Sequence, residues 1–299
     1  MADVQDLYRE HYGMDGRPFG VLADAQLSYA GPRVVQAHAA MEYGILTGAP
    51  VMVLTGDPGT GKTSLVLRLM EEADTALRMV LLCGMRQAGG SVLPWILQAL
   101  GETGAASLPD TEQFTRLQDL LIAEYAAGRR MVLIVDEAQS LSDLALDELR
   151  LLSNINTARD QLLQVLLVGH SALRDRLRQP DMQGLAQRVG IWAAMPPLAP
   201  EEMEAYVGAR LARMGGPEDL FEPEALALVH AVTAGLPRAI NQLCEMALIF
   251  GLTDKAGTVG ADAVRTALDR GMFLAPLPMA GDHAGHTAPP RRLRLASGA

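Results

Sequence analysis

The sequence predicts an α/β domain built on a buried parallel sheet, followed by a small all-helical domain. Up to residue 195, short apolar, β-branched-rich runs alternate with longer helical patterns. The runs show almost no polar alternation, which is typical of strands buried on both faces of a parallel sheet. Beyond residue 200 only helical patterns remain. This order is typical of a doubly wound fold with an appended helical domain.

The individual elements follow from these patterns. Strands are expected at 51–55, 79–83, 131–135, 163–169 and, more weakly, 189–195. Helices are expected between them at 62–73, 92–100, 111–126, 142–154 and 172–177. The helical domain should contain helices at 201–214, 223–234, 237–252 and 260–270. The prolines Pro196, Pro197 and Pro200 mark the boundary between the two domains.

Composition narrows the class of protein. Of the 299 residues, 49% are hydrophobic and 20% are charged, which is ordinary for a globular protein. No apolar run approaches the ~20 residues that span a bilayer, and the acidic, polar start does not resemble a signal peptide. We therefore expect a cytoplasmic protein, with any contact to the inner membrane made through a partner. Cys83 and Cys244 lie in apolar surroundings and are expected to be buried free thiols.

The net charge of −10 bears on possible partners. An acidic surface repels phosphate backbones, so nucleic acid is disfavoured as a partner, although a local basic patch is not excluded.

The segment from Gly56 to Thr63 satisfies the pattern G-x-x-x-x-G-K-[ST] between an expected strand and an expected helix. Glycines let backbone N–H groups surround phosphate oxygens, and the start of the helix adds a positive dipole end. Lys62 should reach the β- and γ-phosphates, and the Thr63 hydroxyl should bind Mg²⁺. The residues expected to hold the phosphates are Gly56, Asp57, Pro58, Gly59, Thr60, Gly61, Lys62, Thr63 and Ser64.

An acidic pair follows the third expected strand. In "MVLIVDEAQ", Asp136 and Glu137 come at the carboxyl end of the strand, where such sheets meet their ligands. Asp136 should hold Mg²⁺ directly or through water, and Glu137 should orient or deprotonate the water that attacks the γ-phosphate. The adjacent pair favours hydrolysis over phosphate transfer to a small molecule.

With these motifs placed, the chain resembles AAA+ ATPases of the ExeA/GspA secretion type and their relatives in exopolysaccharide and exosortase systems. The resemblance covers roughly residues 8–270, through "YREHYGMDGRPF", "YGILTGAPVMVLTGDPGTGKTSL", "LIVDEAQSLSDLALDELRLLSNIN", "LLQVLLVGHSALRDRLRQPDMQGLAQRV" and "GLPRAINQLCEMAL". It implies a three-layer αβα sandwich with strand order 5-1-4-3-2, a helical lid over the nucleotide, ATP as that nucleotide, and a nucleotide-dependent ring or other homo-oligomer.

The resemblance also assigns roles to three further residues. Arg238, in "GLPR", matches the lid arginine that contacts the γ-phosphate. Arg188 matches an arginine finger directed at the nucleotide of a neighbouring subunit, although a solvated surface arginine is the alternative. His170 stands where relatives usually carry a glutamine as polar sensor, so sensing and simple packing remain equal alternatives.

Two departures from the family pattern stand out. Relatives tend to carry an asparagine at the end of the second strand that restrains the catalytic glutamate. Here Gly84 takes that place, so this contact is expected to be missing. Many secretion-type relatives continue into a membrane span and a periplasmic domain, which this sequence does not contain, so a role at the membrane would need a partner.

The resulting domain prediction has four parts. Residues 1–45 form an N-terminal segment packed on the ATPase core, 46–198 the nucleotide-binding domain, 199–271 the helical lid, and 272–299 a disordered tail. Tyr8, Tyr12 and Phe19 of the N-terminal segment are expected to form a hydrophobic clasp, with contact to adenine as the alternative. The tail's His283 and His286 are not expected to bind metal.

The leading functional hypothesis is an ATP-hydrolysing switch or assembly factor that serves secretion or surface-polysaccharide export through a protein partner. One alternative is an ATP-dependent DNA-binding helper of a transposase, which the acidic composition disfavours. A second alternative is a small-molecule phosphotransferase.

Overall fold

The computed structural model describes residues 4–20, 31–85, 90–156, 161–254, 257–271 and 273. Its central feature is one parallel sheet of β1 (Val51–Gly56), β2 (Leu77–Leu82), β3 (Arg130–Val135), β4 (Leu163–Gly169) and β5 (Val189–Met195). The strand order is β2-β3-β4-β1-β5, which is the expected 5-1-4-3-2 read from the other edge. The predicted αβα sandwich is confirmed.

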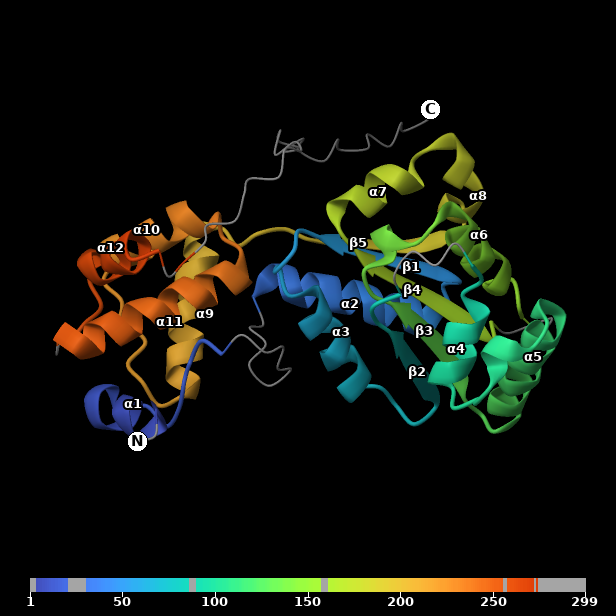
Figure 1. Ribbon diagram of the computed structural model, residues 1–299, viewed down its shortest axis with the longest axis horizontal. Helices are drawn as coiled ribbons and strands as arrows, with labels where there is room; N and C mark the ends of the chain where they lie inside the picture. Colours follow the sequence, from blue (N-terminus) through green and yellow to red (C-terminus); the bar gives the residue numbers. More distant parts are fainter. Residues whose placement is uncertain are drawn as a thin grey trace, which may run out of the picture.

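Helices cover both faces of the sheet (Figure 1). One face carries α2 (Pro32–Thr47) and α3 (Lys62–Glu71). The other face carries α4 (Leu93–Ala99), α5 (Asp110–Ala126), α6 (Asp143–Leu152), α7 (Ser171–Leu177) and α8 (Gln183–Ala186). Short 3-10 turns lie at η1 (Ala105–Ser107), η2 (Ala138–Ser140) and η3 (Pro180–Met182).

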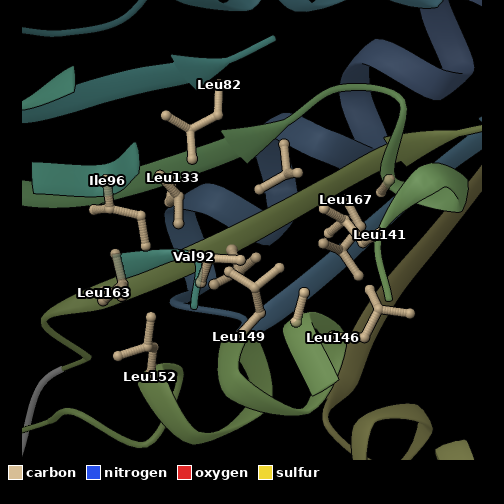
Figure 2. Close-up of a cluster of buried hydrophobic side chains, with 14 of the residues drawn as sticks. Leu82, Val92, Ile96, Leu133, Leu141, Leu146, Leu149, Leu152, Leu163 and Leu167 are labelled. Carbon is tan, nitrogen blue, oxygen red and sulfur yellow. The ribbon is translucent and has the colours of Figure 1, made fainter. Parts of the chain in front are cut away.

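The strands are apolar on both faces because both faces are covered. Along β1, Val51 and Val53 face the core shared with α4–α8, whereas Met52 and Leu54 face α2 and α3. Figure 2 shows the first of these cores, where leucines of α6 meet side chains of β3 and β4. Successive residues of β1, β3 and β4 point alternately into these two cores. Because both cores are apolar, nearly every residue of these strands is apolar.

The register of the sheet brings three carboxyl ends together. Thr55 of β1 lies beside Gly169 of β4, and Leu167 of β4 lies beside Val135 of β3. The residues that follow these strands therefore meet at one edge of the sheet, where open α/β folds bind their ligands.

A third core lies in the helical domain, made of α9 (Pro200–Arg213), α10 (Pro223–Thr233), α11 (Pro237–Asp254) and α12 (Ala261–Asp269). Three of these helices begin at proline, a residue pre-organised for the first turn. The helix α1 (Val4–Tyr12) lies against this domain (Figure 1).

The N-terminal segment differs from its expected arrangement. Residues 4–20 pack into the helical domain, whereas α2 packs on the sheet, so 1–45 does not pack as a whole on the ATPase core. The physical reason lies in Tyr8, Tyr12, Met14 and Phe19, whose side chains complete the core of the helical domain. The expected clasp is therefore present, and its partner is the helical domain. Neither α1 nor α2 is among the helices expected from periodicity.

Polar contacts fix the clasp in place. The Tyr8 hydroxyl donates to Glu245 Oε1 at 2.9 Å, and Arg17 Nε donates to the same oxygen at 2.6 Å. The Tyr12 hydroxyl donates to the carbonyl oxygen of Leu248 at 2.9 Å. Burial, reinforced by the charge of Glu245, raises the pKa of Tyr8 far above its ordinary value. The Glu245 carboxylate, 2% exposed, thus has its charge compensated by Arg17 and accepts a further hydrogen bond from Tyr8.

The two cysteines differ from each other. Cys244 is buried in the helical domain, where burial raises the pKa of its thiol. Cys83 is exposed, which corrects the expectation of two buried thiols. The cause is that β2 ends at Leu82, one residue before the predicted end, so Cys83 lies beyond the sheet.

The predicted tail lies almost entirely outside the described residues. Of the predicted tail at 272–299, only Phe273 is described, so His283 and His286 lie outside the described residues. Among the described helices, none is long and apolar enough to cross a membrane.

The clasp predicts a stability difference between neighbouring residues. Tyr8→Ala should destabilise the helical domain by about 3–5 kcal/mol because the ring is fully buried. Tyr8→Phe should cost about 1–2 kcal/mol, because Glu245 then loses a hydrogen-bond donor. The exposed neighbour provides the control, since Leu7→Ala should change stability by less than about 0.5 kcal/mol. Urea unfolding monitored by circular dichroism measures all three, and equal effects of Tyr8→Ala and Leu7→Ala would contradict the packing.

Candidate nucleotide site

The loop between β1 and α3 has the conformation of a phosphate cradle. Gly59 and Gly61 adopt φ of +85° and +96°, the left-handed region that favours glycine. A Cβ on Gly56 would lie 2.4 Å from the carbonyl oxygen of Met195 in β5. The glycines therefore let the loop turn tightly and pass close to β5, and the backbone N–H groups of a glycine-rich turn of this kind can bind an anion.

Lys62 is the buried cation of this loop. Its side chain is 8% exposed, and its Nζ donates to the carbonyl oxygens of Gly56 at 2.9 Å and Asp57 at 3.0 Å. Burial lowers the pKa of Lys62, while the charges of Glu137, Asp136 and Asp57 act in the opposite direction. Neutral carbonyls hold the ammonium group without neutralising it, so its charge is available to phosphate oxygens. The residues present fit a nucleoside triphosphate.

The other loop residues support this geometry. Thr60 is buried and its hydroxyl donates to the carbonyl oxygen of Asp57 at 2.9 Å, which closes the turn. Pro58 is exposed at the tip of the loop, and Ser64 is half-buried in the first turn of α3.

Thr63 and Asp136 form the contact between the two predicted motifs. The Thr63 hydroxyl donates to Asp136 Oδ2 at 3.0 Å. A hydroxyl and a carboxylate side by side are oxygen ligands of the kind Mg²⁺ prefers, and Mg²⁺ usually takes its remaining ligands from phosphate and water. Among the described residues, no group of three or more His, Cys, Asp or Glu side chains could hold a metal ion. The pair fits a metal that enters together with a nucleotide.

Glu137 follows with an unusual backbone. Its φ is +56°, and its N–H donates to Asp136 Oδ1 at 2.9 Å. The Glu137 side chain is exposed, and its negative charge acts to raise the pKa of Lys62. The side-chain amide of Gln139 donates to the Glu137 carboxylate. Glu137 is thus an exposed, oriented carboxylate next to the phosphate loop, the arrangement that a general base needs.

The end of β4 completes the edge of the site. The backbone N–H of His170 donates to Gln139 Oε1 at 3.0 Å, and the Ser171 hydroxyl donates to Asp57 Oδ1 at 3.1 Å. His170 Nδ1 is buried and has no hydrogen-bond partner among the described residues. Gln139 and Ser171 were not among the predicted site residues, although each follows a strand that ends at this edge.

Arg238 reaches the loop from the helical domain. It lies in the first turn of α11, and its backbone N–H donates to the carbonyl oxygen of Gly59 at 3.2 Å. A Cβ on Gly59 would lie 2.9 Å from the Cβ of Arg238, so glycine permits this close approach. The guanidinium charge is close enough to contribute to the lowered pKa of Lys62. The start of α11 is therefore in direct contact with the cradle.

Arg188 lies away from this group. It directly precedes β5, whereas Met195 at the other end of β5 lies beside Gly56. At ~3.3 Å per residue, the strand separates Arg188 from the loop by roughly 20 Å. Its guanidinium donates to Ser153 Oγ and to the Ser153 carbonyl oxygen, both at 2.8 Å, and also to Asn154. In its own chain, Arg188 fixes the end of α6.

Gly84 follows β2, the neighbour of β3 in the sheet. It has φ of +70° and open space around its α-carbon. A glycine has no side chain that could restrain a carboxylate.

The fold and this site define a P-loop nucleotide-binding protein of the AAA type. Residues 45–177 match the family model described as AAA domain. This region contains β1 to β4 and the phosphate loop, the acidic pair and His170, whereas Arg188 and Arg238 follow it.

The chain is similar to general secretion pathway protein A of Aeromonas hydrophila. The two are 34% identical over 243 residues, which are 81% of this chain and 44% of that protein. The resemblance to ATPases of this secretion type is therefore confirmed. The chain spans less than half the length of that relative.

Solved structures share the fold at lower identity. Cdc6p of Pyrobaculum aerophilum has a TM-score of 0.63 at 18% identity, with 84% of this chain and 72% of that chain covered. ORC2 of Aeropyrum pernix has a TM-score of 0.61 at 18% identity, with 85% and 71% covered. Drosophila ORC bound to DNA has a TM-score of 0.60 at 19% identity, with 86% and 65% covered. Since this fold occurs in a DNA-bound protein, the comparisons do not support the expectation that nucleic acid is disfavoured.

The contacts of Arg188 predict a structural cost of its removal. Arg188→Ala should destabilise the α/β domain by about 1–3 kcal/mol, because the end of α6 loses a charged hydrogen-bond donor. Arg178→Ala is the matched control, since that side chain is exposed at the end of α7 and its loss should cost less than about 0.5 kcal/mol. Thermal unfolding of both variants measures the difference. Unchanged stability of Arg188→Ala would show that these contacts do not stabilise the fold.

Proposed function

We propose that this protein binds ATP with Mg²⁺ and hydrolyses it, and that it uses the cycle as a switch in secretion or surface-polysaccharide export. The observation that carries the proposal is the contact between Thr63 and Asp136, at 3.0 Å, together with the charges of Asp136 and Glu137, which both act on the Lys62 ammonium group. A metal ligand pair, a phosphate-binding cation and a candidate base thus occupy one edge of the sheet.

Each residue has a defined part in this reaction. Backbone N–H groups of the loop and Lys62 hold the phosphates, and Thr63 and Asp136 hold Mg²⁺, which supplies positive charge to the phosphate oxygens. The Glu137 carboxylate orients the attacking water and accepts its proton. The buried position of Lys62 strengthens its interaction with phosphate, because charges interact more strongly away from bulk water.

The lid supplies the switch. Arg238 is carried by α11, and the loop touches this helix through Gly59. A guanidinium that binds the γ-phosphate would hold the lid while ATP is present and release it after hydrolysis. A partner protein could then read the position of the helical domain.

Self-association forms part of the proposal. Arg188 is too far from its own phosphate loop to act there, so a catalytic role would require the nucleotide of a second subunit. Such an arrangement would make hydrolysis depend on assembly. The contacts of Arg188 with Ser153 and Asn154 would then set the direction of its side chain.

The proposed pathway rests on the similarity to general secretion pathway protein A, whose name refers to secretion. A cytoplasmic location with a partner at the inner membrane is consistent with the expectation from the sequence and belongs to the same proposal.

Two substitutions test the assigned chemistry. Glu137→Gln should retain ATP binding and lower turnover by about 100-fold or more, because the base is lost. Lys62→Ala should weaken ATP binding by about 10- to 100-fold, because charge-assisted contacts to phosphate are lost. Phosphate release and equilibrium binding of a fluorescent ATP analogue measure the two effects, over protein concentrations that span self-association.

The control is Glu71→Gln, which removes an exposed carboxylate from the same domain and should leave both quantities unchanged. Turnover by Glu137→Gln equal to that of the unmodified protein would refute the role of Glu137. Undiminished binding by Lys62→Ala would refute the phosphate site.

A further inference from the structure

Gln139 connects the acidic pair to the end of β4. It lies in the turn η2, immediately after the acidic pair, and its side chain is half-buried. Its Nε2 donates to the Glu137 carboxylate, while its Oε1 accepts from the backbone N–H of His170 at 3.0 Å. One side chain therefore links the carboxylate to a neighbouring strand.

The chemistry of the two partners fixes the orientation of this amide. An ionised carboxylate only accepts hydrogen bonds, and a backbone N–H only donates them. The amide must therefore turn its NH₂ to Glu137 and its oxygen to His170. No flipped arrangement of Gln139 would satisfy both partners.

The surroundings hold Gln139 in place. A Cβ on Gly169 would lie 2.7 Å from Gln139 Oε1, so the glycine that ends β4 leaves room for the amide. Arg176 Nη1 donates to the carbonyl oxygen of Gln139 at 3.2 Å and to that of Leu141 at 2.6 Å. Arg176 also pairs with Asp143 at the start of α6. Arg176 of α7 thus holds the backbone of this turn in place.

The same strand end is joined to the phosphate loop. Ser171 directly follows His170, and its hydroxyl donates to Asp57 Oδ1 at 3.1 Å. Continuous contacts therefore run from the phosphate loop through residues 169–171 to Gln139 and then to Glu137.

We infer that Gln139 is a positioning residue for hydrolysis, which holds one oxygen of the Glu137 carboxylate so that the other is free to act on water. This inference rests on the proposed role of Glu137 as the base. A base that is oriented by a third group keeps its reactive geometry without reorganisation during the reaction. The anchor of Gln139 on β4 makes this orientation depend on the strand end that also contacts the phosphate loop.

Two variants separate the donor of Gln139 from its acceptor. Gln139→Leu removes both hydrogen bonds and keeps a side chain of similar length. Gln139→Glu, assayed at pH 8, still accepts from His170 but no longer donates to Glu137. Both should lower kcat by about 10-fold and leave the affinity for ATP within twofold. Gln183→Leu, an exposed glutamine of α8, is the control and should keep the original kcat.

A double variant distinguishes positioning from a general structural effect. If Gln139 acts through Glu137, Gln139→Leu should have no further effect on the residual rate of Glu137→Gln, because effects on one unit are not additive. A further 10-fold loss in that background would overturn the inference. So would a normal kcat in Gln139→Leu, or in Gln139→Glu while Gln139→Leu is impaired.

The outcomes also separate this inference from the proposed function. If the unmodified protein hydrolyses ATP and Glu137→Gln does not, the proposed function stands whatever Gln139 does. If the unmodified protein shows no hydrolysis, or Glu137→Gln retains it, the proposed base fails and the role of Gln139 fails with it.

Discussion

The hydrogen bond between Thr63 and Asp136 is the contact on which the site depends. It joins the start of α3 to the residue that follows β3. The helix α3 follows β1, and β4 lies between β1 and β3 in the sheet. Both residues lie at the same edge of the sheet because the strands are parallel, so that their carboxyl ends meet there. An antiparallel strand at either position would separate the hydroxyl from the carboxylate. The sheet topology therefore sets the geometry of the residue pair proposed to bind the metal.

A second constraint is the burial of charge. Lys62 is held by backbone carbonyls, and burial lowers the pKa of its ammonium group. Arg238 adds positive charge from the helical domain, while Asp136 and Glu137 add negative charge from β3. The site therefore contains opposed charges that an anionic nucleotide with a metal ion can complement. The N-terminal clasp is connected to this site through α11. Tyr8 and Arg17 bind Glu245 in α11, the helix that also carries Arg238.

The sequence predicted the elements and the motifs because these depend on local patterns. Apolar runs and helical periodicity located the strands and most helices, and the spacing of glycine, lysine and threonine located the phosphate loop. Contacts made through long-range packing could not be read in the same way. The attachment of residues 4–20 to the helical domain depends on the contact between Tyr8 and Glu245, which are far apart in the sequence. The role of Gln139 depends on the adjacency of β3 and β4, since the residue otherwise looks like an ordinary turn glutamine. Cys83 was misplaced because strand ends are the least defined part of an apolar run.

The central claim is that Thr63 and Asp136 bind a divalent cation together with a triphosphate. Electron paramagnetic resonance of Mn²⁺, used in place of Mg²⁺, tests it by following the signal of the free ion during titration with protein, with and without a non-hydrolysable ATP analogue. The account predicts that, with the analogue present, the protein removes one Mn²⁺ per chain beyond what the analogue binds alone, and that Asp136→Asn weakens this uptake. Uptake that does not depend on the analogue, or that is unchanged in Asp136→Asn, would contradict the account.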